Sequence, residues 1–414
     1  MRILFANDGL GDGGGVQSYL EAVTHGLDAR GHELALFHCG TESESERGRF
    51  PAGMTFFGGG GAAAAAAVER ARSWAPDLCF SHNMNSLRLE GLFQQTWPVV
   101  KLMHGYFGTC IGGLKTHSTL GARPCGRRFG TACLLHYLPR GCGQMSPSKM
   151  FSHYRWAARQ HELFDGYAAV VVASQHMRRE YVANGIPAER VHVAPLFPTG
   201  AGVPRSGGAR ARERAEPHVL FLGRMTKLKG GDVLIRAAAE AARRSGLRVR
   251  LTLAGDGPQR AGWEALARKL GVAHRFTGWV DDEGREELLS EVSLLAVPSV
   301  WPEPFGLVGL EAARAGVPAV AFDVGGVGEW LKDGVNGLLA SASPPDHRSL
   351  AAALVEAFAD PERLSEMAAA AQCVAREMSL EKHLNLLEEI FRGAVGADAS
   401  RTSRVIGAGA AVAS

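Results

Sequence analysis

The chain has 414 residues, of which 46% are hydrophobic and 21% are charged, and its formal net charge at pH 7 is +3. This length is too great for one ordinary hydrophobic core and predicts two domains of about 150 to 200 residues each. The composition is that of a globular protein. The small net charge argues against a dedicated nucleic-acid-binding protein, while it allows weak attraction to anionic lipids or phosphate ligands.

The start of the chain and its cysteines indicate where the protein resides. The first predicted strand, residues 3–6, begins almost at Met1, which leaves no room for a signal peptide. No run of about 18 apolar residues suggests a membrane span. The seven cysteines are an odd number, which favours reduced thiols over a disulfide scaffold. We therefore expect a cytoplasmic protein.

A glycine-rich loop follows the first strand. Gly9, Gly11 and Gly14 match the spacing G-x-G-x-x-G, and residues 16–29 have the apolar repeat of a helix, so a βαβ unit is predicted. A dinucleotide site is only weakly supported, because the second strand ends in residues 38–40, where no ribose-binding acid stands. A tight strand-to-helix turn is the alternative explanation for each of these glycines.

His104 directly follows the apolar run at residues 99–103. A residue at the carboxyl end of a parallel strand points into the cleft where α/β enzymes bind ligands. Its imidazole can hydrogen-bond a ligand hydroxyl without titrating. A purely structural histidine is the alternative interpretation.

Residues 110–142 depart from a plain βαβ rhythm. One interpretation is a metal site of four thiolates, with His117 or His136 replacing one of them. However, the cysteine spacing includes no C-x-x-C pair and matches no common zinc module, so buried or paired thiols are the favoured alternative. The cysteines in question are Cys110, Cys125, Cys133 and Cys142, and the basic residues of the segment are Lys115, Arg123, Arg127, Arg128 and Arg140. These cations favour an acidic or phosphate-bearing ligand, with a solvated loop as the alternative.

A linker precedes the second domain. Residues 198–217 are rich in Gly, Pro, Ala and Arg and have no apolar periodicity. A strand predicted at 218–222 then runs into Gly223 and Arg224, and Lys229 lies in the same loop. Two cations at the end of a strand can neutralise a diphosphate, although surface cations are common and the spacing alone is a modest signal.

Residues 297–321 read VPSVWPEPFGLVGLEAARAGVPAVA and predict a strand, a proline-rich loop and a helix. Amides at a helix start have no partner inside the helix, and with the helix dipole they form a site for phosphate or another anion. Glu303 and Glu311 flank this site and can accept hydrogen bonds from hydroxyl groups. A ligand with a phosphate and many hydroxyls would satisfy both features. The expected first turn of the helix contains Phe305, Gly306 and Leu307.

The EPFGLVGLE motif, the small-residue run after it, and the G-R-x-x-x-x-K-G arrangement at residues 223–230 resemble the donor-site signature of the retaining glycosyltransferases of family 4. The resemblance covers most of residues 1–392 and is weakest across 110–143. It implies the GT-B fold, in which two Rossmann-like α/β domains with doubly wound parallel sheets face a central cleft. The implied segments are an acceptor-side domain (1–197) with a cysteine-rich insertion (108–143), a linker (198–217), a nucleotide-sugar-binding domain (218–380), a closing helix (381–392) and a disordered tail (393–414).

The resemblance also implies roles for individual residues. Glu303 would contact the donor sugar, Glu311 the nucleotide ribose, and the amides at 305–307 the sugar or diphosphate. His104 would stand close to the transferred sugar. The expected catalytic residues are therefore His104, Arg224, Lys229 and Glu303, and the expected donor-binding residues are Gly14, Gly255, Asp256, Val280, Phe305, Gly306, Leu307 and Glu311.

The implied function is retaining transfer of a hexosyl group from a nucleotide-diphosphate-sugar to an acceptor hydroxyl, in glycan, polysaccharide or glycolipid synthesis. No cofactor or divalent metal would be required, because cations and a helix dipole take the place of the metal. The expected partners are the nucleotide-sugar and a glycan, glycolipid or small-molecule acceptor, with no nucleic acid and with peripheral membrane contact through basic residues of the first domain. Two alternatives stay open: a non-catalytic nucleotide-sugar-binding protein of the same fold, and a nucleotide-dependent oxidoreductase that uses the first glycine loop.

Overall fold

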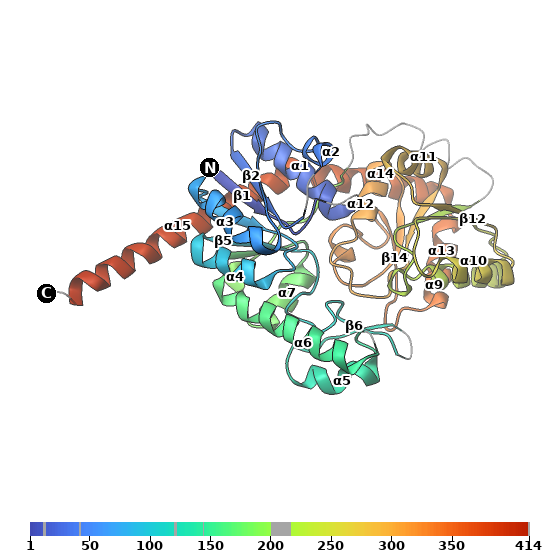
Figure 1. The fold of residues 1–414 in the computed structure, drawn as a ribbon. Helices are drawn as coiled ribbons and strands as arrows, with labels where there is room; N and C mark the ends of the chain where they lie inside the picture. The colour runs from blue at the N-terminus through green and yellow to red at the C-terminus, as the bar shows by residue number, and fades with distance from the viewer. Residues whose placement is uncertain (11–13, 41–42, 120–121, 144, 200–216, 413–414) are drawn as a thin grey trace.

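The computed structural model describes residues 1–10, 14–40, 43–119, 122–143, 145–199 and 217–412. Within these ranges the chain forms two parallel β-sheets, each flanked by helices, in the two halves of the molecule (Figure 1). The prediction of two Rossmann-like parallel-sheet domains is therefore confirmed.

The first sheet has seven strands in the order β3-β2-β1-β4-β5-β8-β9, all paired in parallel. Because helices cover both faces of such a sheet, its strands are continuous apolar runs, as the wholly buried AVVV of β8 illustrates. The strands are β1 (Arg2–Ala6), β2 (Glu33–His38), β3 (Thr55–Gly58), β4 (Leu78–Ser81), β5 (Val99–Met103), β8 (Ala169–Val172) and β9 (Val191–Val193).

The helices of the first half connect these strands. Three of them begin at serine caps: the hydroxyls of Ser43, Ser86 and Ser174 accept hydrogen bonds from the amides of Glu46, Leu89 and Met177, respectively. The helices are α1 (Gly15–Ala29), α2 (Glu44–Arg47), α3 (Ala64–Ser73), α4 (Leu87–Thr96), α6 (Pro147–Glu162) and α7 (Gln175–Ala183), with short 3₁₀ turns η1 (Gly61–Ala63), η2 (Leu163–Gly166) and η3 (Ala188–Arg190).

The cysteine-rich insertion lies between β5 and α6. It contains a small antiparallel pair, β6 (Thr116–His117) with β7 (Arg123–Pro124), and the helix α5 (Ala132–Arg140). Lys115 is 2% exposed and its Nζ lies 2.6 Å from Glu180 Oε2 on α7, so this cation ties the insertion to the domain. It is not available to an acidic ligand, in contrast to the expectation for the basic residues of the segment.

The second sheet has six parallel strands in the order β12-β11-β10-β13-β14-β15. These are β10 (His218–Leu222), β11 (Arg250–Ala254), β12 (His274–Gly278), β13 (Leu294–Val297), β14 (Ala319–Phe322) and β15 (Gly337–Ala340). The accompanying helices are α9 (Gly231–Ser245), α10 (Arg260–Lys269), α11 (Asp282–Glu291), α12 (Leu307–Arg314), α13 (His347–Ala359) and α14 (Pro361–Glu377), with 3₁₀ turns η4 (Lys227–Lys229) and η5 (Val327–Glu329).

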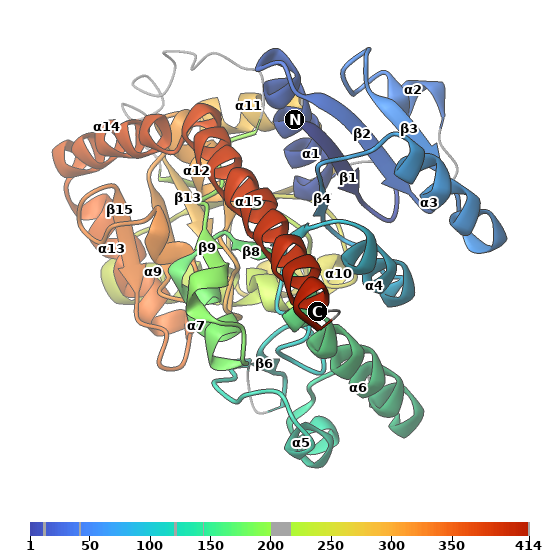
Figure 2. The same cartoon turned by 90° about the vertical axis from the view of Figure 1, so that its left-hand side faces the viewer.

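The last helix, α15 (Leu380–Val412), leaves the second half and crosses the first (Figure 2). Leu384, Leu387 and Phe391 are buried in the same apolar cluster as the first strand, and Glu388 pairs with Arg30 at 3.1 Å. The structure continues this helix to Val412, where the sequence analysis predicts a disordered tail. The physical reason is composition, since the segment is rich in alanine, a strong helix former, and has no proline.

The predicted linker, 198–217, coincides almost entirely with residues 200–216, which lie outside the described ranges. The exact domain boundaries therefore stay a prediction. In the part of the chain that the structure describes, no helix is long and apolar enough to cross a membrane.

Candidate active site

Glu303 is the best-organised polar group of the predicted donor site. It lies in the loop after β13, is 3% exposed, and its Oε1 accepts hydrogen bonds from Lys229 Nζ (2.6 Å), Trp301 Nε1 (2.9 Å) and Ser299 Oγ. Burial acts to raise the pKa of Glu303, but the Lys229 charge and these hydrogen bonds outweigh it and hold the pKa below its ordinary value. The carboxylate is therefore ionised at neutral pH.

The backbone around Lys229 explains how the pair forms. Lys229 ends the turn η4, and Gly230, at φ 66°, begins α9. A Cβ at Gly230 would collide with the Pro298 carbonyl, so only glycine lets the turn approach the loop that carries Glu303. Arg224 lies exposed after β10 on the same side of the sheet as this turn.

The helix α12 begins one turn after Glu303, at Leu307, slightly later than predicted. Gly306 precedes it at φ 89°, and among the described residues no side chain caps the helix. The Trp330 indole packs against Gly306, and its Nε1 donates to the Phe305 carbonyl at 2.7 Å. The start of the helix is thus held rigidly.

Glu311, on the same helix, already has partners from elsewhere in the chain. Its Oε1 accepts a hydrogen bond from Thr199 Oγ1 (3.2 Å) and lies 3.6 Å from Arg285 Nη1. Burial raises the pKa of Glu311, against the opposing effects of Arg285 and Thr199.

Backbone hydrogen bonds link the loops after β10, β11 and β12. Met225 N donates to Asp256 O (2.7 Å), and Gly255 N donates to Gly278 O (2.7 Å). Gly255 has φ 123° and would bring a Cβ against the Gly223 backbone, which requires glycine. Asp256 is exposed and forms an ion pair with Arg260, and Val280 is half-buried in the neighbouring loop.

Gly14 lies across the interdomain space from this group. It precedes α1 at φ 131°, and a Cβ on the adjacent Gly15 would lie 3.9 Å from Leu307 Cδ2 at the start of α12. Gly11 lies outside the described residues. The start of α1, at Gly15, therefore lies close to the start of α12.

His104 is half-buried after β5, and its Nε2 lies 3.2 Å from Nδ1 of His82, which follows β4. Burial, and then the Lys101 charge, lowers the pKa of His104 to about 3, so the imidazole is neutral near pH 7. Lys101 itself is buried and pairs with Glu90 at 3.0 Å. The sequence analysis missed His82, although it stands at the end of its strand much as His104 stands at the end of the next.

The four insertion cysteines come together around one small cavity, with His117 and His136 beside them. All four cysteines are free thiols, and Cys142 Sγ lies 3.7 Å from His117 Nδ1. Burial raises the pKa of Cys142 to about 11, and the three neighbouring thiols act in the same direction. Within the described ranges, no group of three or more metal-binding side chains is arranged to hold an ion.

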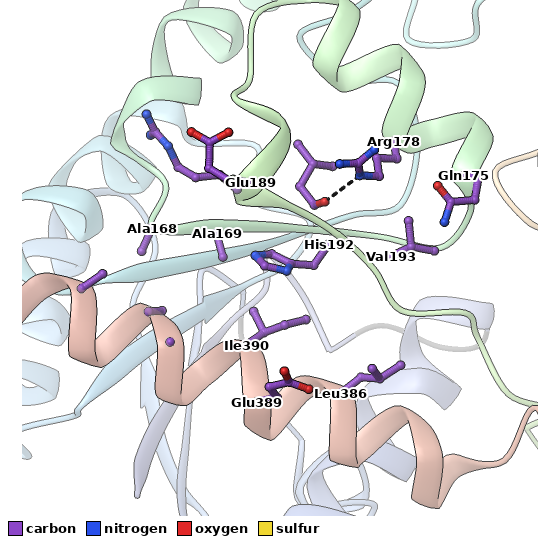
Figure 3. Close-up of a pocket in the computed structure, with 15 residues that line it drawn as sticks. Ala168, Ala169, Gln175, Arg178, Glu189, His192, Val193, Leu386, Glu389 and Ile390 are labelled. Atoms are coloured by element: carbon purple, nitrogen blue, oxygen red, sulfur yellow. Dashed lines mark hydrogen bonds between the residues drawn. The ribbon is translucent and has the colours of Figure 1, made fainter.

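A separate groove of about 810 Å³ lies between β9, α7 and α15 on the outside of the first domain (Figure 3). Arg178 donates a hydrogen bond to the Val191 carbonyl along one side of it. None of the predicted site residues lines this groove.

Two family models match separate parts of the chain. The model "Glycosyltransferase Family 4" matches residues 13–197, and "Glycosyl transferases group 1" matches residues 209–373. The D-inositol 3-phosphate glycosyltransferase of Rhodococcus erythropolis is 39% identical over 188 residues, 42% of this chain and 41% of that protein. The alpha-D-kanosaminyltransferase of Streptomyces kanamyceticus is 33% identical over 237 residues, 54% of this chain and 60% of that protein. The chain thus spans about half the length of these curated relatives.

Two solved structures resemble the whole fold. Anabaena Alr3699/HepE in complex with UDP-glucose has a TM-score of 0.67 at 21% identity, and the match covers 94% of this chain and 99% of that one. WaaG, described as a glycosyltransferase involved in lipopolysaccharide biosynthesis, has a TM-score of 0.67 at 19% identity with the same coverage of 94% and 99%. At these identities the likeness establishes the architecture alone.

Proposed function

The chain belongs to the glycosyltransferases of family 4 and group 1, whose two models match its two halves, and on this premise we propose that it is a retaining glycosyltransferase with the GT-B fold. It transfers a hexosyl group from a nucleotide-diphosphate-sugar to an acceptor hydroxyl. The observation that carries the proposal is the contact between Lys229 and Glu303 at the start of α12, where a cation, a carboxylate and open amides occur together.

The diphosphate lies between the cations and the helix start. Lys229 and Arg224 supply positive charge, and the first amides of α12 supply hydrogen-bond donors. These groups stabilise the negative charge that develops as the diphosphate leaves, which is the work that a divalent metal does in other sites. We therefore propose that transfer requires no divalent metal.

Glu303 orients the donor sugar. All three hydrogen bonds that it accepts from described residues reach Oε1, which leaves Oε2 for the sugar hydroxyls. Glu311 accepts hydrogen bonds from the ribose after Thr199 withdraws. The loops around Gly255 and Val280 enclose the base.

The transfer step occurs on one face of the sugar. The bond between the anomeric carbon and the diphosphate oxygen breaks as the acceptor oxygen bonds to the same carbon, and the acceptor proton passes to the departing phosphate. His104, kept neutral by burial, hydrogen-bonds the sugar without taking the proton.

The relatives suggest which acceptors to examine first. Curated relatives act, by name, on D-inositol 3-phosphate or make glycogen, and a structural neighbour contains UDP-glucose. We propose a UDP-hexose as donor and a glycan, glycolipid or small polyol as acceptor. The oxidoreductase alternative is disfavoured, because β2 ends in His38 rather than an acid.

The cysteine cluster has, in our proposal, a structural role. It stabilises the insertion through buried thiols, and any metal bound there would be structural, since none of the predicted donor residues lines its cavity.

We also propose a cytoplasmic protein whose insertion, together with the first turns of α6, touches an anionic membrane surface. Leu135, Met145 and Phe151 are exposed by 77%, 69% and 55%, and the cations Arg128 and Lys149 lie exposed on the same segment. Sedimentation with phosphatidylglycerol vesicles tests this contact. Binding that salt and Leu135→Asp both weaken is expected, whereas equal binding to neutral vesicles would contradict it.

A panel of UDP-, GDP- and ADP-sugars tests the main function by thermal shift and by release of nucleoside diphosphate. One nucleotide-sugar should stabilise and be consumed by the wild type, with weaker effects in Arg224→Ala and Lys229→Ala. Lys227→Ala is the matched control, because Lys227 is an exposed lysine of the same turn. A donor that binds without any turnover, even to water, would favour the non-catalytic alternative, and no shift in folded protein would reject donor binding.

A further inference from the structure

A carboxylate of the second domain caps a helix of the first. Glu329 ends the turn η5, and its Oε1 accepts a hydrogen bond from the Gln175 amide at 2.7 Å. Gln175 is the first residue of α7, so its amide has no partner inside that helix. The Ser174 hydroxyl, which caps α7 from its own domain, accepts from the Met177 amide and leaves the Gln175 amide to Glu329. Because the helix dipole also favours a carboxylate at a helix start, this contact stabilises the approach of the two domains.

The loop that carries Glu329 also touches the first domain through a glycine. A Cβ on Gly326 would lie 2.7 Å from Ser174 Cβ and 2.8 Å from Ser174 Oγ, so a larger residue here would push the domains apart. Ser174 is fully buried at this contact. The start of α7 therefore packs directly against the loop after β14.

The same loop holds the backbone of Glu303. Gly326 N donates a hydrogen bond to the Glu303 carbonyl at 2.7 Å. Gly325 has φ 61°, and a Cβ there would collide with the Glu303 backbone, so glycine is required for this close approach. Residues 325–329 thus join the start of α7 to the loop that contains the predicted sugar-binding carboxylate.

A second interdomain contact reaches the Glu303 side chain. The Trp301 indole donates to Glu303 Oε1 at 2.9 Å. The same indole meets the Tyr106 ring edge to face, with centroids 6.4 Å apart and an interplanar angle of 88°. Tyr106 is fully buried in the loop after β5 of the first domain. The first domain therefore contacts the Glu303 loop at two places, through Gly326 and through Trp301.

We propose that Glu329 is a positioning residue for the transfer reaction. Its hydrogen bond to the start of α7 fixes the separation between the two halves of the site, His104 on the first domain and Glu303 on the second. Glu329 itself contacts neither substrate in this proposal. The inference rests on the proposed function and assigns a residue that brings its two domains into register.

Loss of this contact should affect turnover more than nucleotide binding. The groups proposed for the diphosphate are Arg224, Lys229 and the first amides of α12, and all of them belong to the second domain. Glu329→Ala should therefore lower kcat for release of nucleoside diphosphate about tenfold, as expected for one hydrogen bond to a charged group, while UDP affinity stays within about twofold of wild type. Glu329→Gln keeps an acceptor oxygen and should recover most of the activity.

The backbone donor can be removed independently of Glu329. Gln175→Pro deletes the amide at the first position of α7, where proline is compatible with a helix. Ser174 before it has φ −147° and ψ 157°, the extended backbone that a residue preceding proline prefers. If Glu329 acts through this amide, Glu329→Ala and Gln175→Pro should lower kcat similarly, and the double variant should be no slower than either. Gln175→Ala is the matched control, because it removes an exposed side chain and keeps the amide.

Small-angle X-ray scattering supplies a readout that is independent of activity. With UDP present, Glu329→Ala and Gln175→Pro should both have a larger radius of gyration than wild type, whereas Gln175→Ala should not. Three results would overturn the role of Glu329: losses in kcat that add in the double variant, a fall in UDP affinity as large as the fall in kcat, or an unchanged radius of gyration. A wild type that releases no nucleoside diphosphate from any nucleotide-sugar would instead count against the proposed function, so the two failures are distinguishable.

Discussion

Replacing Glu303 by alanine should separate its role in catalysis from its role in the fold. In the structure this carboxylate is 3% exposed and accepts hydrogen bonds from Lys229, Ser299 and Trp301. A hydrogen bond to a charged group contributes about 1.5 to 3 kcal/mol. If one such bond holds a sugar hydroxyl in the transition state, kcat/KM should fall roughly 10- to 150-fold.

The same change should also destabilise the protein. Breaking a buried ion pair costs about 3 to 5 kcal/mol. Because the Lys229 side chain is 26% exposed, we expect the free energy of unfolding to fall by about 2 to 3 kcal/mol. Glu303→Gln keeps an acceptor oxygen without the charge and should lie between alanine and wild type in both respects.

The assay is release of nucleoside diphosphate from the donor that the panel identifies, with urea unfolding run in parallel. Glu366→Ala, an exposed glutamate of α14, is the control. A folded Glu303→Ala protein with kcat/KM within about twofold of wild type, well below the loss expected from one charged hydrogen bond, would refute the assignment of Glu303 to the sugar.

Three further predictions concern other parts of the structure. Burial lowers the pKa of His383 to about 4, so as pH falls from about 6.5 the unfolded chain binds a proton at this histidine before the folded chain does. The free energy of unfolding should therefore decrease between pH 7 and pH 5 by about 2 kcal/mol more in wild type than in His383→Gln, as measured by urea unfolding. Thr199→Val removes the hydroxyl that donates a hydrogen bond to the Glu311 carboxylate, and calorimetry should show UDP binding roughly 3- to 10-fold tighter. Unchanged affinity would mean that the ribose does not hydrogen-bond to Glu311. Thiol titration of the unfolded protein should find all seven cysteines reduced, and metal analysis by mass spectrometry should find no stoichiometric zinc. If the wild type instead carried one zinc per chain and Cys142→Ser lost it, the cluster would be a metal site.

The elements that the sequence predicted well are those whose chemistry is local. The start of α12 after a proline-rich loop follows from the prolines and Gly306 alone, and the buried strands follow from continuous apolar runs. Lys229 and Glu303 are 74 residues apart, yet each stands in a loop after a parallel strand. Because such loops share one edge of the sheet, their meeting was predictable.

The contacts that the sequence did not predict join segments whose relation depends on the whole fold. Thr199 reaches Glu311 across 112 residues, and no local pattern marks it. The buried Lys101 interrupts an otherwise apolar strand, and only the position of Glu90 on α4 explains it. Trp156 belongs to α6, the helix that follows the insertion, and no local motif marks its contact with Phe107.

The return of α15 to the first domain has a consequence for synthesis of the chain. Tyr19 bonds to His383 across 364 residues, and Leu384, Leu387 and Phe391 complete the apolar cluster that contains Phe5 and Leu20. A nascent first domain leaving the ribosome therefore lacks one wall of its core until almost all of the second has been translated. Domains usually fold in the order in which they are made. Here the second domain can complete its core before the first, and the apolar face of α1 stays uncovered in the interval.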